Sequence, residues 1–346
     1  MSQIGWIDFS SEHRDKVRLI LDLLKQKGVL DELGIGGIRD TFSDQLFPGI
    51  STIQTRAKYF VIIPALLREY LQFPPAKRKS TTLDQFLKRR EREIRARLVE
   101  KHHDNFRNLG IIGSTFGTDL HRGVVRRPSS VYWNGLVSYG IVRPSISLAE
   151  FGRRAIDSGD ILSASAGGTS KERGDESDLL DSSLPRVLSP NLGEDYWESI
   201  DIELTADEAV FLRNQITSTQ PRSLLGLILM NPEAIHQIRS IETGKFEDFC
   251  ALPYVSTISD QELIGTLFQA RDFWRMLRGA HILYDCLLQK RFGTEELLES
   301  CENEWDQWRE DMEEFPQHWR TEELWKRCSD GGRKIRPATR SQVIAP

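Results

Sequence analysis

The periodicity of apolar residues is the feature that most constrains how this chain can fold. From residue 259 to about residue 291, large apolar side chains recur at steps of three and four, which places them on one face of an α-helix. A capping-box pattern at 259–262 begins this segment, and a second one at 205–208 begins another. Similar helical patterns cover residues 11–28, 53–72 and 83–103. We therefore expect a mostly α-helical protein.

A stretch of altered composition divides the helical segments into two groups. Between Asp157 and Asn191 serine, glycine, aspartate and glutamate dominate, and large apolar residues are scarce. Such a segment buries too little apolar surface to offset the entropy lost on ordering, so we expect a flexible linker or long loop at 155–192. It separates a predicted basic, helical N-terminal domain (1–154) from an acidic, helical C-terminal domain (193–328). We expect residues 329–346 to form a disordered tail.

Charge is distributed unevenly between these parts. The chain has 46 lysines and arginines and 51 acidic residues, for a formal net charge of −5. Residues 1–150 hold 24 of the basic residues and 16 of the acidic ones, so the remainder holds 22 and 35. Concentrated positive charge favours contact with phosphate groups. The alternatives are that the two halves attract each other, or that the basic residues form solvated helix faces.

The basic residues gather in two consecutive segments. In the helix predicted at 83–103, Lys88, Arg92 and Arg95 are four and three residues apart and share a face. Residues 128–144 predict a short helix, a glycine stop and a strand with arginines on both sides, which is the order of a winged-helix domain, whose recognition helix enters the DNA major groove. For this winged-helix-like segment near 83–144, the predicted nucleic-acid contacts are Lys88, Arg89, Arg92, Arg95, Arg122, Arg126, Arg127, Tyr132, Asn134 and Arg143. Winged helices also dock proteins, so that alternative stays open.

The segment from residue 31 to residue 60 combines glycines, a Pro-Gly turn and charges of both signs. Its spacing indicates a structural network of charged side chains, namely Arg39, Asp40, Asp44, Arg56 and Lys58. A metal-dependent nuclease using Asp40 and Asp44 is an alternative, but no strand-borne Glu-x-Lys element accompanies these carboxylates. The glycines do not form a nucleotide-binding fingerprint. We therefore predict no catalytic residue.

Five short motifs are concentrated in the first 60 residues. They are Trp-Ile-Asp-Phe-Ser at 6–10, Asp-Glu-Leu-Gly-Ile-Gly at 31–36, Arg-Asp at 39–40, Leu-Phe-Pro-Gly at 46–49 and Thr-Arg-Ala-Lys-Tyr-Phe at 55–60. Together they resemble the DUF6361 family, a bacterial and archaeal family of unknown function, and a looser similarity continues to about residue 284. Families of this sort lie in prokaryotic defence gene clusters, so the resemblance implies a role in antiphage defence. It implies no catalytic residue.

In the C-terminal half, we expect a strand at 196–204 from its apolar–polar alternation. The long helix at 259–291 also carries a row of arginines, Arg271, Arg275 and Arg278. The following segment, 294–315, is rich in glutamate and aspartate. We expect ion pairs between this acidic helix and the arginine row.

Other features predict neither a metal site nor a membrane span. The four cysteines are scattered, and the adjacent His102 and His103 point in directions about 100° apart on a helix, so they cannot share one ion. No apolar run approaches the roughly 20 residues of a membrane span, and the N-terminus lacks a signal-peptide pattern. We expect a cytoplasmic protein without a cofactor.

Taken together, the residues favour a non-enzymatic subunit that binds DNA or assembles with other proteins, and the family resemblance implies that the assembly is a defence complex. A protein-interaction scaffold without nucleic-acid contact is the alternative, and a metal-dependent nuclease is the less favoured one.

Overall fold

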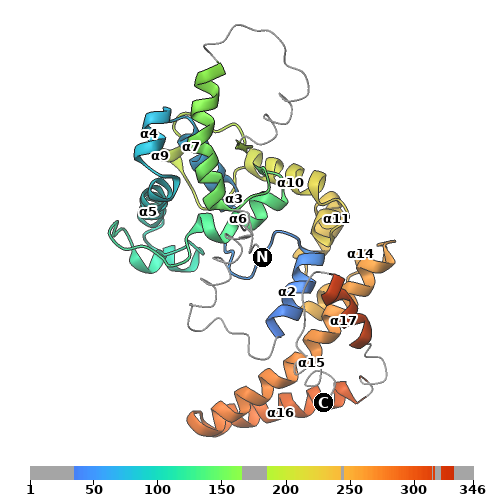
Figure 1. The fold of residues 1–346 in the computed structure, drawn as a ribbon. Helices are drawn as coiled ribbons and strands as arrows, with labels where there is room; N and C mark the ends of the chain where they lie inside the picture. Colours follow the sequence, from blue (N-terminus) through green and yellow to red (C-terminus); the bar gives the residue numbers. More distant parts are fainter. Residues whose placement is uncertain (1–34, 166–184, 243–244, 314, 316–320, 331–346) are drawn as a thin grey trace, which may run out of the picture. The chain divides into compact units, whose positions relative to one another are not determined.

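The computed structural model describes residues 35–165, 185–242, 245–313, 315 and 321–330, and these are mostly helical, as the periodicity predicts (Figure 1). The first group of elements is α2 (Ile35–Leu46), α3 (Tyr59–Leu71), α4 (Pro75–Ser80), α5 (Leu83–Lys101), η1 (Phe106–Asn108), η2 (Ser114–Phe116), α6 (Pro128–Ser138), β1 (Val142–Arg143), α7 (Leu148–Ser165) and β2 (Arg186–Val187). The second group is α9 (Tyr196–Ser199), α10 (Ala206–Thr219), α11 (Leu224–Met230), α12 (Pro232–Arg239), α13 (Phe246–Cys250), α14 (Pro253–Ser256), α15 (Gln261–Phe292), α16 (Glu295–Met312) and α17 (Thr321–Asp330). The helix expected at 11–28 lies outside the described residues.

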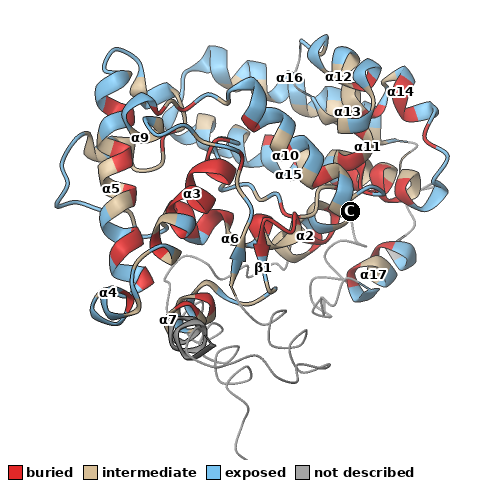
Figure 2. Ribbon diagram, turned by 90° about the horizontal axis from the view of Figure 1, so that it is seen from above, coloured by how far each residue is buried: buried red, intermediate tan, exposed pale blue. Residues whose placement is uncertain are grey.

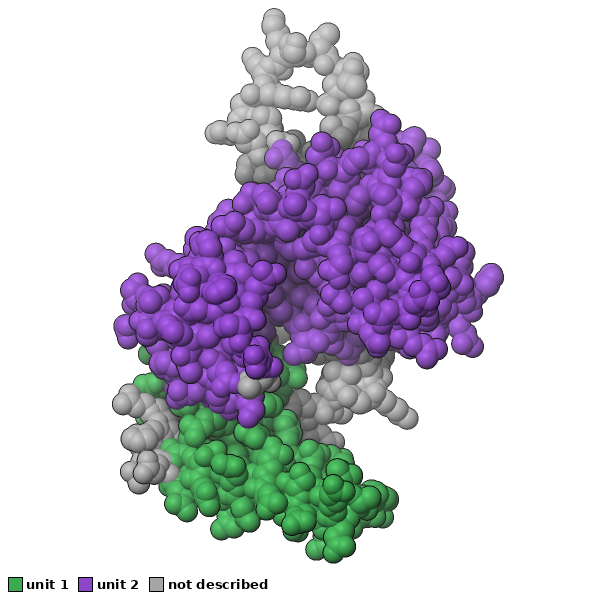
Figure 3. All heavy atoms as spheres, turned by 180° about the vertical axis from the view of Figure 1, so that it is seen from behind, with its two compact units in different colours: residues 1–42, 272–346 green, residues 43–271 purple. Residues whose placement is uncertain are grey.

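The chain forms two compact units, which Figure 3 distinguishes by colour. The large unit is Ser43–Arg271, and the small unit combines Met1–Phe42 with Asp272–Pro346. This division differs from the predicted one, because residues on both sides of the predicted linker belong to the large unit. Helix α7 also extends to Ser165, so the first part of that predicted linker is helical. Residues 166–184, the middle of the predicted linker, lie outside the described part of the chain, as does the predicted tail from residue 331.

Long-range contacts explain why the large unit crosses the predicted boundary. Strands β1 and β2 pair in antiparallel fashion, with Val142 opposite Val187. Lys58 at the start of α3 forms a buried ion pair with Glu208 of α10, with 2.7 Å between the amine and the carboxylate. Both contacts join residues more than 40 positions apart, and composition alone carries no signal for them.

Helix α3 is at the centre of the large unit, with α5, α6 and α10 packed against it. It is buried along nearly its whole length in Figure 2, because most of its thirteen residues are apolar or aromatic. The Phe60 ring lies 5.0 Å from that of Tyr132 on α6, edge to face. The helix begins at Tyr59 rather than near residue 53, and it continues through Pro64.

The structure does not confirm the predicted winged-helix segment. Helix α6 ends before Gly140, which has a φ of 62°, and strand β1 follows, as the sequence predicts. However, β1 pairs with β2, and the whole of helix α7 lies between these two strands in the chain, so they are not joined by a hairpin turn. A wing is a hairpin of consecutive strands, and the described residues do not form one.

The predicted helix starts hold with one change. Thr82 and Gln85 form a capping box at α5, and Thr205 and Glu208 form another at α10. At α15 the cap is Asp260, whose carboxylate accepts the N–H groups of residues 262 and 263, and not the preceding serine. The strand predicted at 196–204 is wrong, because residues 196–199 form the short helix α9 and residues 200–204 form no strand.

In the small unit, helices α15 and α16 lie side by side (Figure 1). Arg278 pairs with Glu304 at 2.8 Å, and Arg275 donates to the backbone carbonyl of Asp311. The expected pairing of the arginine row with the acidic helix is therefore confirmed for Arg278. Within the described residues, no helix combines the length and the apolar character that crossing a membrane requires.

Candidate anion-binding cleft

A cleft of about 410 Å³ lies in the large unit between α5 and the loop that leads to α6. Its cationic lining residues are Lys88, Arg92, Arg95 and Arg127, and its acidic ones are Asp84 and Glu91. Ile112 and residues 123–125 and 128 complete the lining. The structure therefore brings four of the predicted nucleic-acid contacts to one place.

Helix α5 supplies three of the cations because of its period. Arg92 and Arg95 follow Lys88 by four and seven residues, so the three side chains leave the helix on one face. The opposite edge packs into the core through Phe86, Leu87 and Ile94, together with Leu98. Because the core fixes the rotation of α5, the cationic face must point into the cleft.

Two of these arginines hold the facing loop. Arg92 donates to the carbonyl of Leu120 at 3.2 Å, and Arg95 donates to the carbonyls of Arg122, at 2.9 Å, and of Asp119. A carbonyl acceptor orients a guanidinium but does not cancel its charge. Arg92 and Arg95 therefore build the cleft wall and leave its positive charge in place.

Gly123 allows the loop to approach α5. A Cβ at this position would lie 2.9 Å from the guanidinium of Arg92, closer than real contacts of this kind. The loop residue next to it, Val124, packs against Gly113, whose φ of 79° favours glycine. The two glycines thus set how closely the loop lies to the cationic face.

Arg127 differs from the other three cations because it meets carboxylates. Its guanidinium pairs with Asp84, and its Nε lies 3.9 Å from Glu91. Lys88 is exposed and makes no hydrogen bond or ion pair with the residues that the structure describes. Lys88 is therefore the cation of the cleft that is available to a ligand without breaking an internal contact.

Glu91 is buried in the cleft wall. One carboxylate oxygen accepts the backbone N–H of Ser129 at 2.7 Å, near the start of α6, and the other has no hydrogen-bond partner within the described residues. Burial raises the pKa of Glu91 to about 7, although the Ser129 hydrogen bond and the charge of Arg127 act in the opposite direction. The sequence analysis did not single out Glu91. Its spacing from Leu87 and Ile94, which places it near the apolar edge of the helix, is the sequence signal for its burial.

The remaining predicted contacts lie elsewhere. Arg122 and Arg126 are exposed on the loop that forms the cleft wall, whereas Arg89 forms an ion pair with Glu93 outside the cleft lining. Asn134 and Arg143 are exposed on α6 and β1, and neither lines the cleft.

Tyr132 is not at the surface. It is fully buried, and its hydroxyl accepts the backbone N–H groups of Thr55 and Arg56 and donates to the carbonyl of Arg56. Helix α6 turns this residue inward because it packs on α3. Tyr132 therefore stabilises the turn before α3, and the prediction of a DNA contact there does not agree with its position.

The charged network predicted for residues 39–58 is divided. Arg39 pairs with Asp40 at 2.8 Å within α2. Arg56 pairs instead with Glu203 at 3.2 Å, and Lys58 pairs with Glu208. Burial leaves only 2% and 3% of the Lys58 and Glu208 side chains exposed, so this pair is part of the core. These partners lie some 150 residues away, and sequence spacing gave no indication of them.

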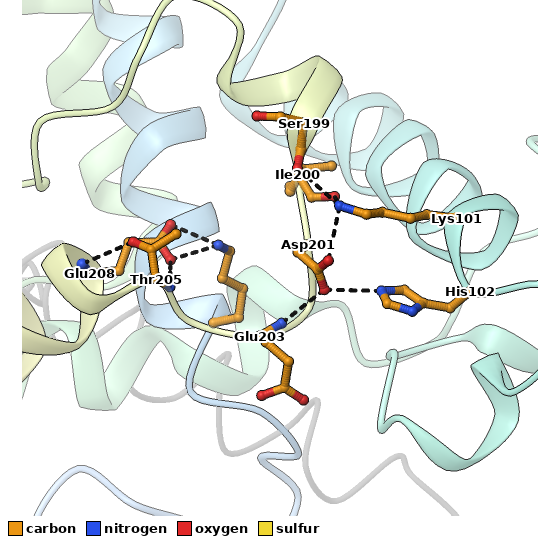
Figure 4. Close-up of polar contacts among 9 residues, drawn as sticks. Lys101, His102, Ser199, Ile200, Asp201, Glu203, Thr205 and Glu208 are labelled. Carbon is orange, nitrogen blue, oxygen red and sulfur yellow. Dashed lines mark hydrogen bonds and ion pairs between the residues drawn. The ribbon is translucent and has the colours of Figure 1, made fainter.

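A second polar cluster joins the C-terminal end of α5 to residues 199–203 (Figure 4). The Lys101 amine lies 2.9 Å from a carboxylate oxygen of Asp201, and His102 lies 3.0 Å from the other. Burial opposes ionisation of Asp201, but hydrogen bonds from Lys101, the Glu203 backbone and His102 outweigh it and lower its pKa. His102 thus serves the fold, and within the described residues no three histidine, cysteine or acidic side chains gather as metal ligands.

The fold is mostly helical, and its cationic cleft lies between α5 and the loop that leads to α6. The chain belongs to DUF6361, a family of unknown function, whose model matches residues 1–322, and this confirms the resemblance seen in the motifs. Neither the curated proteins nor the solved structures gave a match to this chain.

Proposed function

We propose that this protein binds the phosphate groups of DNA through the cleft on α5 and the basic loop that faces it. The observation that carries this proposal is the convergence of Lys88, Arg92, Arg95 and Arg127 on one cleft. The exposed Arg122 and Arg126 extend the positive surface along the same loop. The binding surface is therefore larger than the cleft alone.

The balance of charge in the cleft supports an anionic ligand. Four cations face two carboxyl groups, Asp84 and Glu91, so the lining is positive even when both are ionised. Arg92 is half-buried and held by a backbone carbonyl, so its charge is kept for a ligand, whereas Arg95 is buried in the cleft wall. Guanidinium groups in fixed orientation match phosphate oxygens in geometry as well as in charge.

The arrangement favours contact with the phosphate backbone over reading of bases. The helix that resembles a recognition helix, α6, is largely buried against α3, so its side chains do not form a free face for a groove. Cations on α5 and a loop provide phosphate contacts, which position a protein on DNA but carry no sequence information. We therefore expect binding with little sequence preference and a steep dependence on salt.

Replacing Lys88 tests this proposal most cleanly, because Lys88 is exposed and supports no internal contact in the described part of the chain. We expect Lys88→Glu to weaken binding to a duplex by about tenfold or more at low salt and to reduce the slope of log K against log salt by about 1 or more. Fluorescence anisotropy with a labelled duplex, titrated at two salt concentrations, measures both quantities.

The matched control is Arg222→Glu, which makes the same reversal of charge at an exposed residue between α10 and α11. We expect this variant to bind as the wild type does, apart from the small change in net charge. Wild-type protein that shows no duplex binding at low salt would exclude the proposed function. Equal weakening by both variants would show that overall charge, and not the cleft, drives the binding.

The defence context rests on the family resemblance and stays a prediction. If it is correct, genes for nucleases or helicases should lie beside members of this family, and the protein should co-purify with their products. Under this proposal the protein supplies DNA contact to such an assembly.

A further inference from the structure

The small unit has an apolar surface that the contacts described above do not use. On the C-terminal half of α15, Tyr284, Leu287 and Phe292 expose 62%, 60% and 75% of their surface, and Leu283 and Leu288 are also exposed. Single exposed apolar residues are ordinary, but a contiguous group of large ones marks an interaction site.

Tyr284, Leu287 and Leu288 share one face of the helix, and Leu283 and Phe292 flank this face on its two sides. The side of α15 that meets α16 includes Arg275 and Gly279, where an added Cβ would overlap Trp308. Helical spacing places Tyr284, Leu287 and Arg291 on the opposite side. The exposed residues therefore form an outer stripe, 283–292. The stripe faces away from α16, which is the helix that the described contacts place along this part of α15.

The hairpin of α15 and α16 buries few side chains. Ile282 of α15 is buried, but no residue of α16 is, and Trp308 and the Arg278–Glu304 pair join the two helices. A pair of helices leaves much of its apolar surface open to solvent, and packing against further helices covers it. A second α-helical hairpin on the outer stripe would provide these helices.

We propose that the outer stripe is a dimer interface in which α15 of a second copy of this chain packs antiparallel against it. In an arrangement with a two-fold axis near Leu287 and Leu288, Arg291 of each copy faces Tyr284 of the other, because these positions are equally far from the axis. An arginine over a tyrosine ring is an attractive pair, and the symmetry provides it twice. The stripe is thus complementary to itself through these cation–π pairs as well as through its apolar surface.

The size of the stripe is consistent with a stable dimer. Its five large apolar side chains expose on the order of 500 Å² per copy, given that an aromatic side chain alone offers about 150–250 Å². A protein interface of standard size buries about 800 Å² per partner, and about two-thirds of a homodimer interface is apolar. The stripe supplies roughly that apolar share. This proposal does not depend on DNA binding by the cleft, which lies in the other unit.

Analytical ultracentrifugation of the full chain between about 1 and 100 µM tests the dimer, since interfaces of this size have dissociation constants in the micromolar range or below. We expect the wild type to dimerise and Leu287→Glu to raise the dissociation constant at least about tenfold. Arg309→Glu, on an exposed part of α16, is the control and should dimerise as the wild type does.

A reciprocal exchange distinguishes a second copy from a different partner. Arg291→Glu alone should weaken the dimer, and Arg291→Glu combined with Tyr284→Lys should restore it, because each new lysine then faces a new glutamate across the axis. Restoration within one chain is expected only if both sides of the interface are the same residues. A monomeric wild type at the highest concentration, or weakening by Arg291→Glu without recovery in the double variant, would overturn the proposal. Far-UV circular dichroism establishes that each variant is helical.

Discussion

Burial changes the role of individual charges in this protein. Glu91 follows Arg90 and precedes Arg92 in a run of exposed and half-exposed charges, yet only 8% of it is exposed. Lys58 and Glu208, at the start of α3 and in the first turn of α10, likewise reside in the core. A buried carboxyl group without a full set of partners prefers its neutral form, which makes its effect on stability dependent on pH.

The variant Glu91→Gln should reveal this pH dependence. The pKa of Glu91 is raised in the folded state from an ordinary 4.5 to about 7, so the folded protein binds more protons than the unfolded one between these values. The proton on Glu91 therefore stabilises the folded protein by at most about 3 kcal/mol. This stabilisation is fully present below pH 4.5 and is lost as the pH rises through about 7. Urea denaturation should therefore show Glu91→Gln gaining stability relative to the wild type between pH 5 and pH 8.

The comparison needs no separate control, because glutamine can still accept the Ser129 hydrogen bond and differs from glutamic acid only in lacking the titration. If the difference in unfolding free energy between the two proteins were constant from pH 5 to pH 8, Glu91 would not titrate in this range.

At the scale of elements, the contact between α3 and α6 positions the core of the large unit. It depends on Gly135, where an added Cβ would lie 2.5 Å from the carbonyl oxygen of Gly49 and 2.6 Å from the Phe60 ring. Neither a backbone oxygen nor a packed ring can move away easily. Gly135 is therefore required for the two helices and the turn at Gly49 to come together.

We expect Gly135→Ala to destabilise the protein by about 1–3 kcal/mol, the usual cost of overpacking a core. Gly193→Ala is the matched control, because no atom lies within 4 Å of the Cβ that it would add. Thermal unfolding followed by circular dichroism should show a lower midpoint for the first variant only. Equal midpoints for the two variants would show that α6 can shift without cost.

At the scale of the whole molecule, the large unit joins segments from both sides of the predicted linker. Ile200, Ile202 and Leu212 belong to the same apolar core as Phe60 and Tyr132. Lys101 and Arg97 also hold residues 197–201 through hydrogen bonds and an ion pair. The N-terminal part consequently lacks some of its core when it is separated from the rest.

We therefore expect a fragment of residues 1–165 to lack a cooperative unfolding transition by itself. Without Glu208, Lys58 would be a buried charge with no partner, and the core would have to open to let water reach it. Adding a fragment of residues 185–346 should restore the transition. A fragment 1–165 that unfolds cooperatively at the temperature of the full chain would instead support the domain boundary that composition predicts.

The sequence by itself determined the helical class, the approximate limits of α5 and α15, and the helix start at Thr205. Periodicity and capping are local, since they depend on residues three or four positions apart, and local patterns can be seen in a chain before it folds. The cationic face of α5 was visible for the same reason.

Only the tertiary structure decided which charges remain available to a ligand. It placed Arg127 against Asp84, Arg95 against loop carbonyls and Tyr132 inside the core. It also replaced the predicted boundary with one large unit, through pairs such as Lys58 and Glu208. These outcomes depend on which distant segments pack together, and that is set by burial of the whole apolar surface and not by the neighbours of a residue in the chain.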